Sequence, residues 1–204
     1  MHVGFSNPHQ KGGQTTETFW SKMKIYDDVL DKQFLDYINQ SISKMKWEIH
    51  RSTHNQETPV FFNSVTIDQN IQKNEFIFLF DNIFSIIKNE PEIEGKDIRI
   101  ERGYVNLYPF GIGGDWHTDS DTTDGKTILF YPSDWKEKYG GVTEFQESGE
   151  KVEYKKNRLL IFDGIKSHRS AVHQNPKNRY TVAFKIFIED KKLMAKQAKA
   201  ADLS

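Results

Sequence analysis

The sequence predicts a mostly β fold with buttressing helices, and three observations lead to this prediction. Two segments in the first half of the chain carry apolar residues at helical spacing. From Asp97 onward the apolar residues recur with a period of two, as in half-buried strands. The runs in this second half are short and are separated by Gly, Pro, Asp and Ser, which form turns between strands. We therefore expect a β structure that helices cover on one side.

The two helices are expected from Asp31 to Met45 and from Ile71 to Ile87. Their apolar residues share one helix face: Phe34, Leu35, Ile38, Ile42 and Met45 in the first, and Phe76, Ile77, Leu79, Phe80, Ile83, Phe84 and Ile87 in the second. Both faces are predicted to pack on the core rather than to bind a partner. Residues 53–64 between the helices, THNQETPVFFNS, form either a lid over a substrate or a strand of the main sheet.

The strands expected in the second half of the chain are Ile98–Tyr108, Lys126–Tyr131, Val142–Gln146, Arg158–Phe162, Ser167–His173 and Arg179–Glu189. A length of 204 residues suits one domain, at 17–190, with a helical buttress at 31–88 and the strands at 97–189. Residues 1–16 lack periodicity and are predicted to form a flexible arm. Residues 191–204 are predicted to form a frayed, partly helical tail.

The last strand and the first each have one apolar face and one polar face. Their polar faces hold Arg179, Thr181, Ala183 and Lys185 in the last strand, and Tyr104, Asn106 and Tyr108 in the first. Such a face lines a cavity or borders solvent, and strand parity leaves both interpretations open.

Composition excludes several classes of function. The chain has no cysteine, which excludes disulfides, zinc knuckles and thiol catalysis. The formal net charge of −1 supplies no electrostatic basis for binding nucleic acid or an anionic membrane. The N-terminal residues lack the apolar stretch of a signal peptide, and no apolar run is long enough to span a membrane. We therefore expect a cytoplasmic protein without nucleic-acid or membrane partners.

A candidate metal-binding pair follows the glycine-rich turn GIGG at 111–114. Residues i and i+2 of an extended segment point the same way, so His117 and Asp119 can bind one metal ion together. Taken alone the pair is a weak signal, because a surface histidine near an aspartate is common.

A facial triad of two histidines and one carboxylate needs a third ligand, for which His168 and His173 are candidates. They are five residues apart, so a regular strand points them to opposite faces. His168 follows the expected strand 158–162 and its turn, and we predict that it is the ligand and that His173 is exposed. Three protein ligands leave positions on the metal open, which suits non-haem Fe(II) oxygen chemistry better than a closed structural site.

Residues 98–189 resemble the 2-oxoglutarate/Fe(II) oxygenases of the prolyl 4-hydroxylase-like branch. The resemblance rests on YPFGIGGDWHTDSD, TILFYPSDWKEKYGGVTEF, NRLLIFDGIKSHRS and NRYTVAFKIF. In the order of that family, these segments carry an HxD pair, a GGxxxF-like strand, a strand ending in FD, a distal histidine and Arg-x-Thr. Two features depart from the family pattern. Tyr-Pro-Ser at 131–133 replaces the common Tyr-Leu-Asn, and the eleven-residue step from His168 to Arg179 is long.

The resemblance implies a double-stranded β-helix (jelly-roll) fold and an iron site. Its metal ligands are implied to be His117, Asp119 and His168. The implied cofactors are Fe(II) and the cosubstrate 2-oxoglutarate, with ascorbate as an optional third, and no catalytic residue is implied beyond the iron ligands.

The resemblance also implies that Arg179 binds the distal carboxylate of 2-oxoglutarate. A planar guanidinium matches a carboxylate in two parallel hydrogen bonds, which lysine cannot reproduce. Thr181, on the same strand face, is implied to add a hydroxyl bond. Further implied 2-oxoglutarate-binding positions are Tyr108, Tyr131, Asn106 and Leu129. For the two tyrosines and Leu129, an ordinary core position is the alternative.

The implied reaction is hydroxylation of an unactivated C–H bond, with 2-oxoglutarate and O2 converted to succinate and CO2. Prolyl hydroxylation leads by analogy, and another protein side chain, a free amino acid or a small metabolite remains open. A different class of function is a non-catalytic jelly-roll module that binds metal or protein. The sequence assigns no substrate-binding residue.

Overall fold

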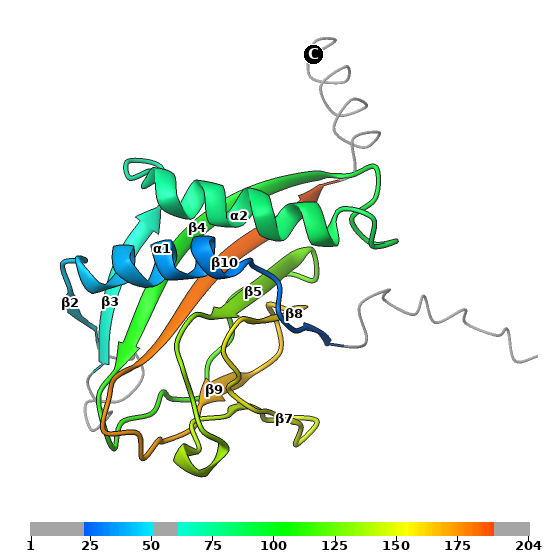
Figure 1. The fold of residues 1–204 in the computed structure, drawn as a ribbon. Coiled ribbons are helices and arrows are strands. Elements are labelled where there is room, and N and C mark those ends of the chain that lie inside the picture. The colour runs from blue at the N-terminus through cyan, green and yellow to red at the C-terminus, as the bar shows by residue number, and fades with distance from the viewer. Residues whose placement is uncertain (1–22, 51–60, 190–204) are drawn as a thin grey trace, which may run out of the picture.

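The structure, a computed structural model, describes residues 23–50 and 61–189 (Figure 1). The arm expected at 1–16 and the tail expected at 191–204 lie outside the described residues. So does the part of the segment 53–64 that precedes Phe61.

The described residues form two α-helices, two antiparallel sheets and a short 3-10 helix, Glu137–Tyr139. The helices are α1 (Lys32–Ser43) and α2 (Asn74–Ile87). The main sheet has the order β1-β8-β5-β10-β4-β3-β2, with β1 (Lys24–Tyr26), β2 (Glu48–His50), β3 (Phe61–Ile67), β4 (Asp97–Tyr108), β5 (Gly125–Tyr131), β8 (Arg158–Asp163) and β10 (Arg179–Glu189). The small sheet has the order β7-β6-β9, with β6 (Thr143–Phe145), β7 (Lys151–Val152) and β9 (His168–Ser170).

Both helices lie across one face of the main sheet, and the small sheet lies away from them (Figure 1). Helix α1 begins after Asp31, whose carboxylate accepts a hydrogen bond of 2.9 Å from the backbone N–H of Phe34. Helix α2 buries Phe76 and Leu79 completely against the sheet. Each such ring or branched side chain contributes roughly 1.5–3 kcal/mol of hydrophobic free energy when it leaves water.

Strand β10 separates two apolar clusters. Val182 and Phe184 belong to the cluster under the helices, whereas Ala183 belongs to a second cluster on the opposite face. Tyr180 packs on the helix side, with its ring centroid 5.8 Å from that of Trp47. The strand parity predicted from the sequence is therefore confirmed, and the polar face of β10 looks toward the small sheet.

The expected strands at β4, β5, β8 and β10 agree with the structure to within one residue at each end. Strand β9 is shorter than expected, because only His168–Ser170 of the segment 167–173 is regular. Strand β3 makes the end of the segment 53–64 part of the main sheet.

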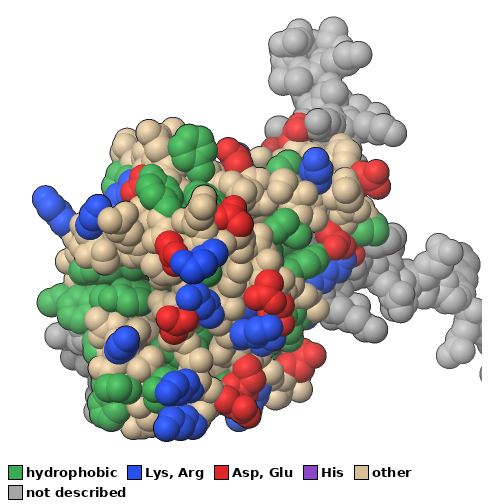
Figure 2. All heavy atoms as spheres, in the orientation of Figure 1, with side chains coloured by type: hydrophobic (Ala, Val, Ile, Leu, Met, Phe, Trp, Pro, Cys, Tyr) green, Lys and Arg blue, Asp and Glu red, His purple; other side chains and the backbone are tan. Residues whose placement is uncertain are grey.

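Basic and acidic side chains are interspersed on the face shown in Figure 2, as the near-zero net charge leads one to expect. Within 23–50 and 61–189, neither helix has the length and apolar character needed to cross a membrane.

Candidate active site

His117, Asp119 and His168 meet where the loop between β4 and β5 approaches the start of β9. The backbone N–H of His117 donates to the carbonyl of His168 (3.1 Å), and the N–H of His168 donates to the carbonyl of His117 (2.9 Å). This reciprocal pair brings two residues that are far apart in sequence side by side, with ring centroids 4.4 Å apart. The backbone N–H of Asp119 donates to the carbonyl of Gly164 (2.8 Å), which anchors the carboxylate beside them.

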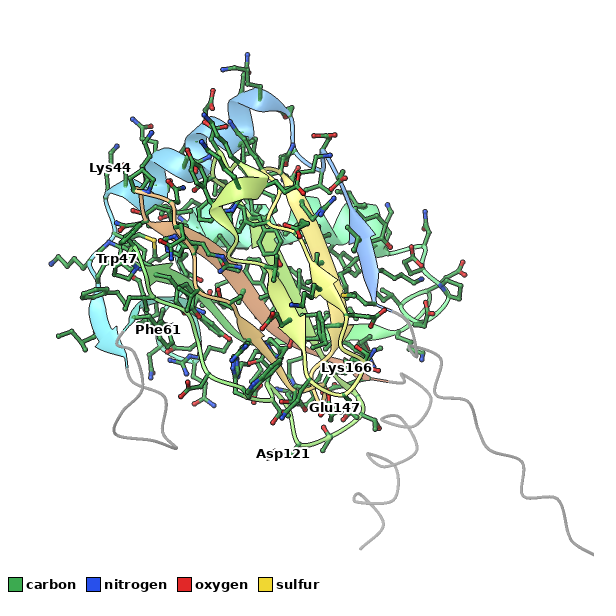
Figure 3. All side chains as sticks on the ribbon, turned by 90° about the horizontal axis from the view of Figure 1, so that it is seen from below. Lys44, Trp47, Phe61, Asp121, Glu147 and Lys166 are labelled. Carbon is green, nitrogen blue, oxygen red and sulfur yellow. The ribbon has the colours of Figure 1, made fainter. Side chains whose placement is uncertain are left out.

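In Figure 3 the labelled residues Asp121, Glu147 and Lys166, which belong to loops that border the site, lie toward one end of the β structure. Hydrogen bonds support the view, since the backbone N–H of Gln146 donates to the carbonyl of Ser167 over 2.9 Å.

The ligand atoms of the three side chains lie within 4.8 Å of one another. The Nε2 of His168 is 3.5 Å from one carboxylate oxygen of Asp119, and the Nε2 of His117 is 3.8 Å from the other. Each Nδ1 lies at a backbone carbonyl, that of Asp115 for His117 (2.8 Å) and that of Lys166 for His168 (2.9 Å). A carbonyl only accepts, so each Nδ1 carries the hydrogen and each Nε2 keeps a lone pair that faces the carboxylate.

The electrostatics of the site favour the protonation states that a metal requires. Burial lowers the pKa of His168 to about 4, because the charged imidazolium would lose its hydration. Burial alone would raise the pKa of Asp119, but the charges of His168, Lys185 and His117 outweigh it and hold that pKa below its usual value. At neutral pH the site therefore contains a neutral imidazole at His168 and an ionised carboxylate, the forms that bind metal ions.

Arg179 is 1% exposed and only partly satisfied. Its Nε donates to the carbonyl of Gly141 (3.0 Å) and its Nη1 donates to the hydroxyl of Thr181 (2.7 Å). Its Nη2 is buried without a hydrogen-bond partner among the described residues. A buried, unpaired guanidinium donor is costly, which makes this atom a candidate donor to an anionic ligand.

One small cavity, of about 30 Å³, joins the triad to Arg179. It is lined by Tyr104, Asn106, Tyr108, His117, Asp119, Leu129, Thr143, His168, Arg169, Ser170, Arg179 and Thr181. The sequence prediction names most of these positions, but Tyr131 is not among them. The hydroxyl of Tyr131 lies 2.7 Å from that of Thr143, and its ring stacks on Tyr154 behind the guanidinium of Arg179.

No protein-family model matches the chain, and no curated protein matches it by sequence. Solved structures match by fold. One is a prolyl hydroxylase from Trichoplax adhaerens in complex with a peptide fragment of the hypoxia inducible factor oxygen degradation domain. It has 18% identity and a TM-score of 0.61, over 83% of this chain and 84% of that one. A viral collagen prolyl hydroxylase from Paramecium Bursaria Chlorella virus-1, in complex with 2-oxoglutarate, has 17% identity and a TM-score of 0.57, over 80% and 94%. HygX from Streptomyces hygroscopicus, with nickel and 2-oxoglutarate bound, has 11% identity and a TM-score of 0.61, over 81% and 82%.

The chain has the fold of the 2-oxoglutarate/Fe(II) oxygenases. The expected mostly β class and jelly roll are thereby confirmed. At identities this low the likeness concerns the oxygenase fold, and the roles of individual residues rest on their geometry in this chain.

Within this oxygenase fold, the structure adds three polar contacts that strand parity did not reveal. Thr127 donates its hydroxyl to one oxygen of Asp119 (2.8 Å), and Lys185 places its Nζ 3.0 Å from the other. The ring of Tyr154 lies 5.0 Å from the guanidinium carbon of Arg179. For Lys185, the sequence offered one indication of a role in the site: it is a lysine on a strand face whose preceding residues are buried.

The expectation that His173 is exposed is wrong. His173 is fully buried, its Nε2 donates a hydrogen bond of 3.0 Å to the carbonyl of Tyr108, and its ring packs against that of Trp135. The physical reason is Gly141, which has φ of 72° and where a Cβ would lie 2.9 Å from the Cβ of His173. Because Gly141 has no side chain, its backbone can pack directly against His173 in this oxygenase fold. His173 is not part of the metal-ligand cluster.

Proposed function

We propose that this protein is an Fe(II)- and 2-oxoglutarate-dependent oxygenase. The observation that carries the proposal is one cavity with a His-Asp-His cluster at one end and a buried arginine with an unpaired donor at the other. The proposed reaction converts R–H, O2 and 2-oxoglutarate into R–OH, succinate and CO2.

The residues at the first end fit a divalent ion. His117, Asp119 and His168 supply two imidazole nitrogens and one carboxylate, the donor set of the facial triad that holds non-haem Fe(II). Both histidines are held in the ligating tautomer by backbone carbonyls, so the ion would meet donors that are already oriented.

The residues at the second end fit the distal carboxylate of 2-oxoglutarate. Arg179 would pair with it through Nη2, and Thr181 holds the guanidinium in place from the same strand face. Burial raises the pKa of Tyr108 to about 12, so its hydroxyl keeps its proton at neutral pH and can donate to an anion. Leu129, also in the cavity, offers an apolar contact to the methylene groups between the two carboxylates.

Iron with 2-oxoglutarate supplies the oxidising chemistry, and the protein supplies binding, orientation and exclusion of water. The chain's contribution is geometric. The rings of Tyr108, Tyr131 and Tyr154 surround the guanidinium of Arg179, at 5.6, 5.6 and 5.0 Å, and shield it from solvent. A carboxylate bound there loses little to competing water, because the effective dielectric constant is low.

The substrate is proposed to be a protein side chain or a small molecule, and prolyl hydroxylation leads by analogy with the prolyl hydroxylases of the same fold. A second cavity, of about 400 Å³, shares only Asp119 with the first. Its other lining residues are Asp68, Gln69, Asn70, Glu101, Arg102 and Lys185, all polar or charged.

Two measurements test the proposal. Calorimetry with the Co(II)-loaded protein should show binding of 2-oxoglutarate, and the Fe(II)-loaded protein in air should release succinate at a rate that a substrate increases. Protein that binds Co(II) but neither binds nor consumes 2-oxoglutarate would instead be a non-catalytic metal-binding module.

A further inference from the structure

Lys185 and Thr127 hold the two oxygens of the Asp119 carboxylate from two neighbouring strands. Lys185 on β10 is the direct cross-strand partner of Thr127 on β5. The hydroxyl of Thr127 donates over 2.8 Å to one oxygen, and the ammonium of Lys185 lies 3.0 Å from the other. With both oxygens engaged by donors from a paired position in a rigid sheet, the carboxylate has little freedom to rotate.

Lys185 approaches Asp119 from a second cavity rather than from the one that contains Arg179. The cavity that the three ligand side chains share with Arg179 is not lined by Lys185. Lys185 lines the second cavity, which touches the site only through Asp119. Asp119 is thus the residue at which the two cavities meet.

The contact is also well shielded. The Asp119 side chain is 3% exposed and that of Lys185 is 25% exposed, so the pair lies largely out of water. Arg102 also lines the second cavity and serves as a matched control. Its guanidinium carbon lies 5.7 Å from the centre of the Tyr104 ring, much as the Lys185 ammonium does at 5.9 Å, but Arg102 forms no ion pair with Asp119.

We propose that Lys185 is a positioning residue of the metal site, which fixes the Asp119 carboxylate in the orientation that binds the ion. A carboxylate that turned freely could chelate the ion through both oxygens and occupy a position needed by the cosubstrate. Donors on both oxygens disfavour that arrangement. The inference rests on the proposed function in one respect, that a divalent ion binds at His117, Asp119 and His168.

The test is a Co(II) titration of chelator-treated protein without 2-oxoglutarate, so the readout is independent of turnover. Lys185→Met keeps the length and apolar stem of the side chain, and we expect the Co(II) dissociation constant to rise roughly 10- to 100-fold. Lys185→Arg, which can still donate to the carboxylate, should restore most of the affinity. Arg102→Met should bind as the wild type does. Thermal unfolding of each metal-free variant checks the fold, and Lys185→Gln replaces the methionine variant should that one not fold.

Several results would overturn the inference. Unchanged affinity in Lys185→Met would remove the positioning role. Tighter binding would show that the lysine acts only as a competing positive charge. An equal loss in Lys185→Met and Lys185→Arg would assign the effect to packing.

Failure of the proposed function looks different. Wild-type protein that binds Co(II) but makes no succinate contradicts the oxygenase and leaves the Lys185 result intact. Wild-type protein that makes succinate, with Lys185→Met binding Co(II) normally, contradicts only the lysine inference. Wild-type protein that binds no Co(II) contradicts both.

Discussion

The two ends of the cavity both contain a buried charge, but they satisfy it differently. The Asp119 carboxylate is held by groups of the protein itself, the hydroxyl donor of Thr127 and the ammonium of Lys185. The Arg179 guanidinium keeps one donor with no partner among the described residues. A buried group that is fully satisfied belongs to a permanent site, whereas one left short of a partner marks where an exchangeable ligand binds. This comparison predicts that a substitution at the arginine end weakens 2-oxoglutarate binding without loss of metal binding, whereas loss of a metal ligand abolishes metal binding.

Removing a ligand at the metal end should have the largest effect. His168→Ala is expected to abolish tight Fe(II) or Co(II) binding and succinate formation, because two ligands hold the ion poorly. His173→Ala is the control and should keep Co(II) binding. It should lower the free energy of unfolding by roughly 1–3 kcal/mol, because the carbonyl of Tyr108 and the N–H of Asn175 lose a buried partner. The reverse outcome in a metal titration would move the third ligand to His173.

At the other end, Arg179→Ala should weaken 2-oxoglutarate binding by roughly 2–5 kcal/mol while Co(II) binding is retained. Arg99, an exposed arginine on β4 paired with Glu189, serves as the matched control, and Arg99→Ala should leave cosubstrate affinity unchanged. Calorimetry on the Co(II)-loaded variants measures both. Equal affinity in the wild type and Arg179→Ala would take Arg179 out of the cosubstrate site.

The pH dependence of stability should also sharpen the comparison, in the metal-free protein. An unfolded histidine takes up a proton near pH 6.5, whereas burial delays protonation of native His168 to about pH 4. The unfolded state therefore binds more protons in this window, and the free energy of unfolding should fall as the pH is lowered from about 6.5 to about 4, by up to about 3 kcal/mol. Denaturant titrations across this range should show a shallower dependence in His168→Ala. An equally steep slope in the variant would assign it to other groups.

The smallest effect is expected from the hydroxyl that supports Arg179. Thr181→Val removes the acceptor of Nη1 while preserving shape, and should weaken 2-oxoglutarate binding by about 0.5–1.5 kcal/mol. Thr66→Val is a stringent control, since Thr66 is also a buried threonine but its hydroxyl has no partner among the described residues. Cosubstrate affinity should be unaffected by it, and a loss in both variants would point to general repacking.

Periodicity and ordered motifs sufficed for the long elements and for most of the residues that line the cavity. The apolar alternation in β10 assigns Tyr180 to the helix side and Arg179 to the cavity, because a period of two over eleven residues admits one register. The strands β1, β2 and β7 have three residues or fewer, too few for a period to appear. The segment 31–88, expected to be a helical buttress, accordingly also contains β2 and β3.

The partners of the metal ligands were beyond such reasoning, because they depend on how strands pair. Thr127 and Lys185 meet at Asp119 only because β5 and β10 align in one register. Nothing in either strand's own sequence specifies that alignment. The burial of His173 similarly depends on a left-handed glycine in a distant loop, Gly141.

The reciprocal backbone bonds between His117 and His168 have a consequence for how the site forms. They close when the loop after β4 joins β9, so the two imidazoles come together as the chain folds and need no ion to gather them. The entropy of ordering these ligands is then lost during folding rather than during metal capture. The backbone amide protons of His117 and His168 are the donors of these two hydrogen bonds. Their exchange with deuterated water should slow when an ion occupies the site, which makes them a reporter of metal occupancy built into the backbone.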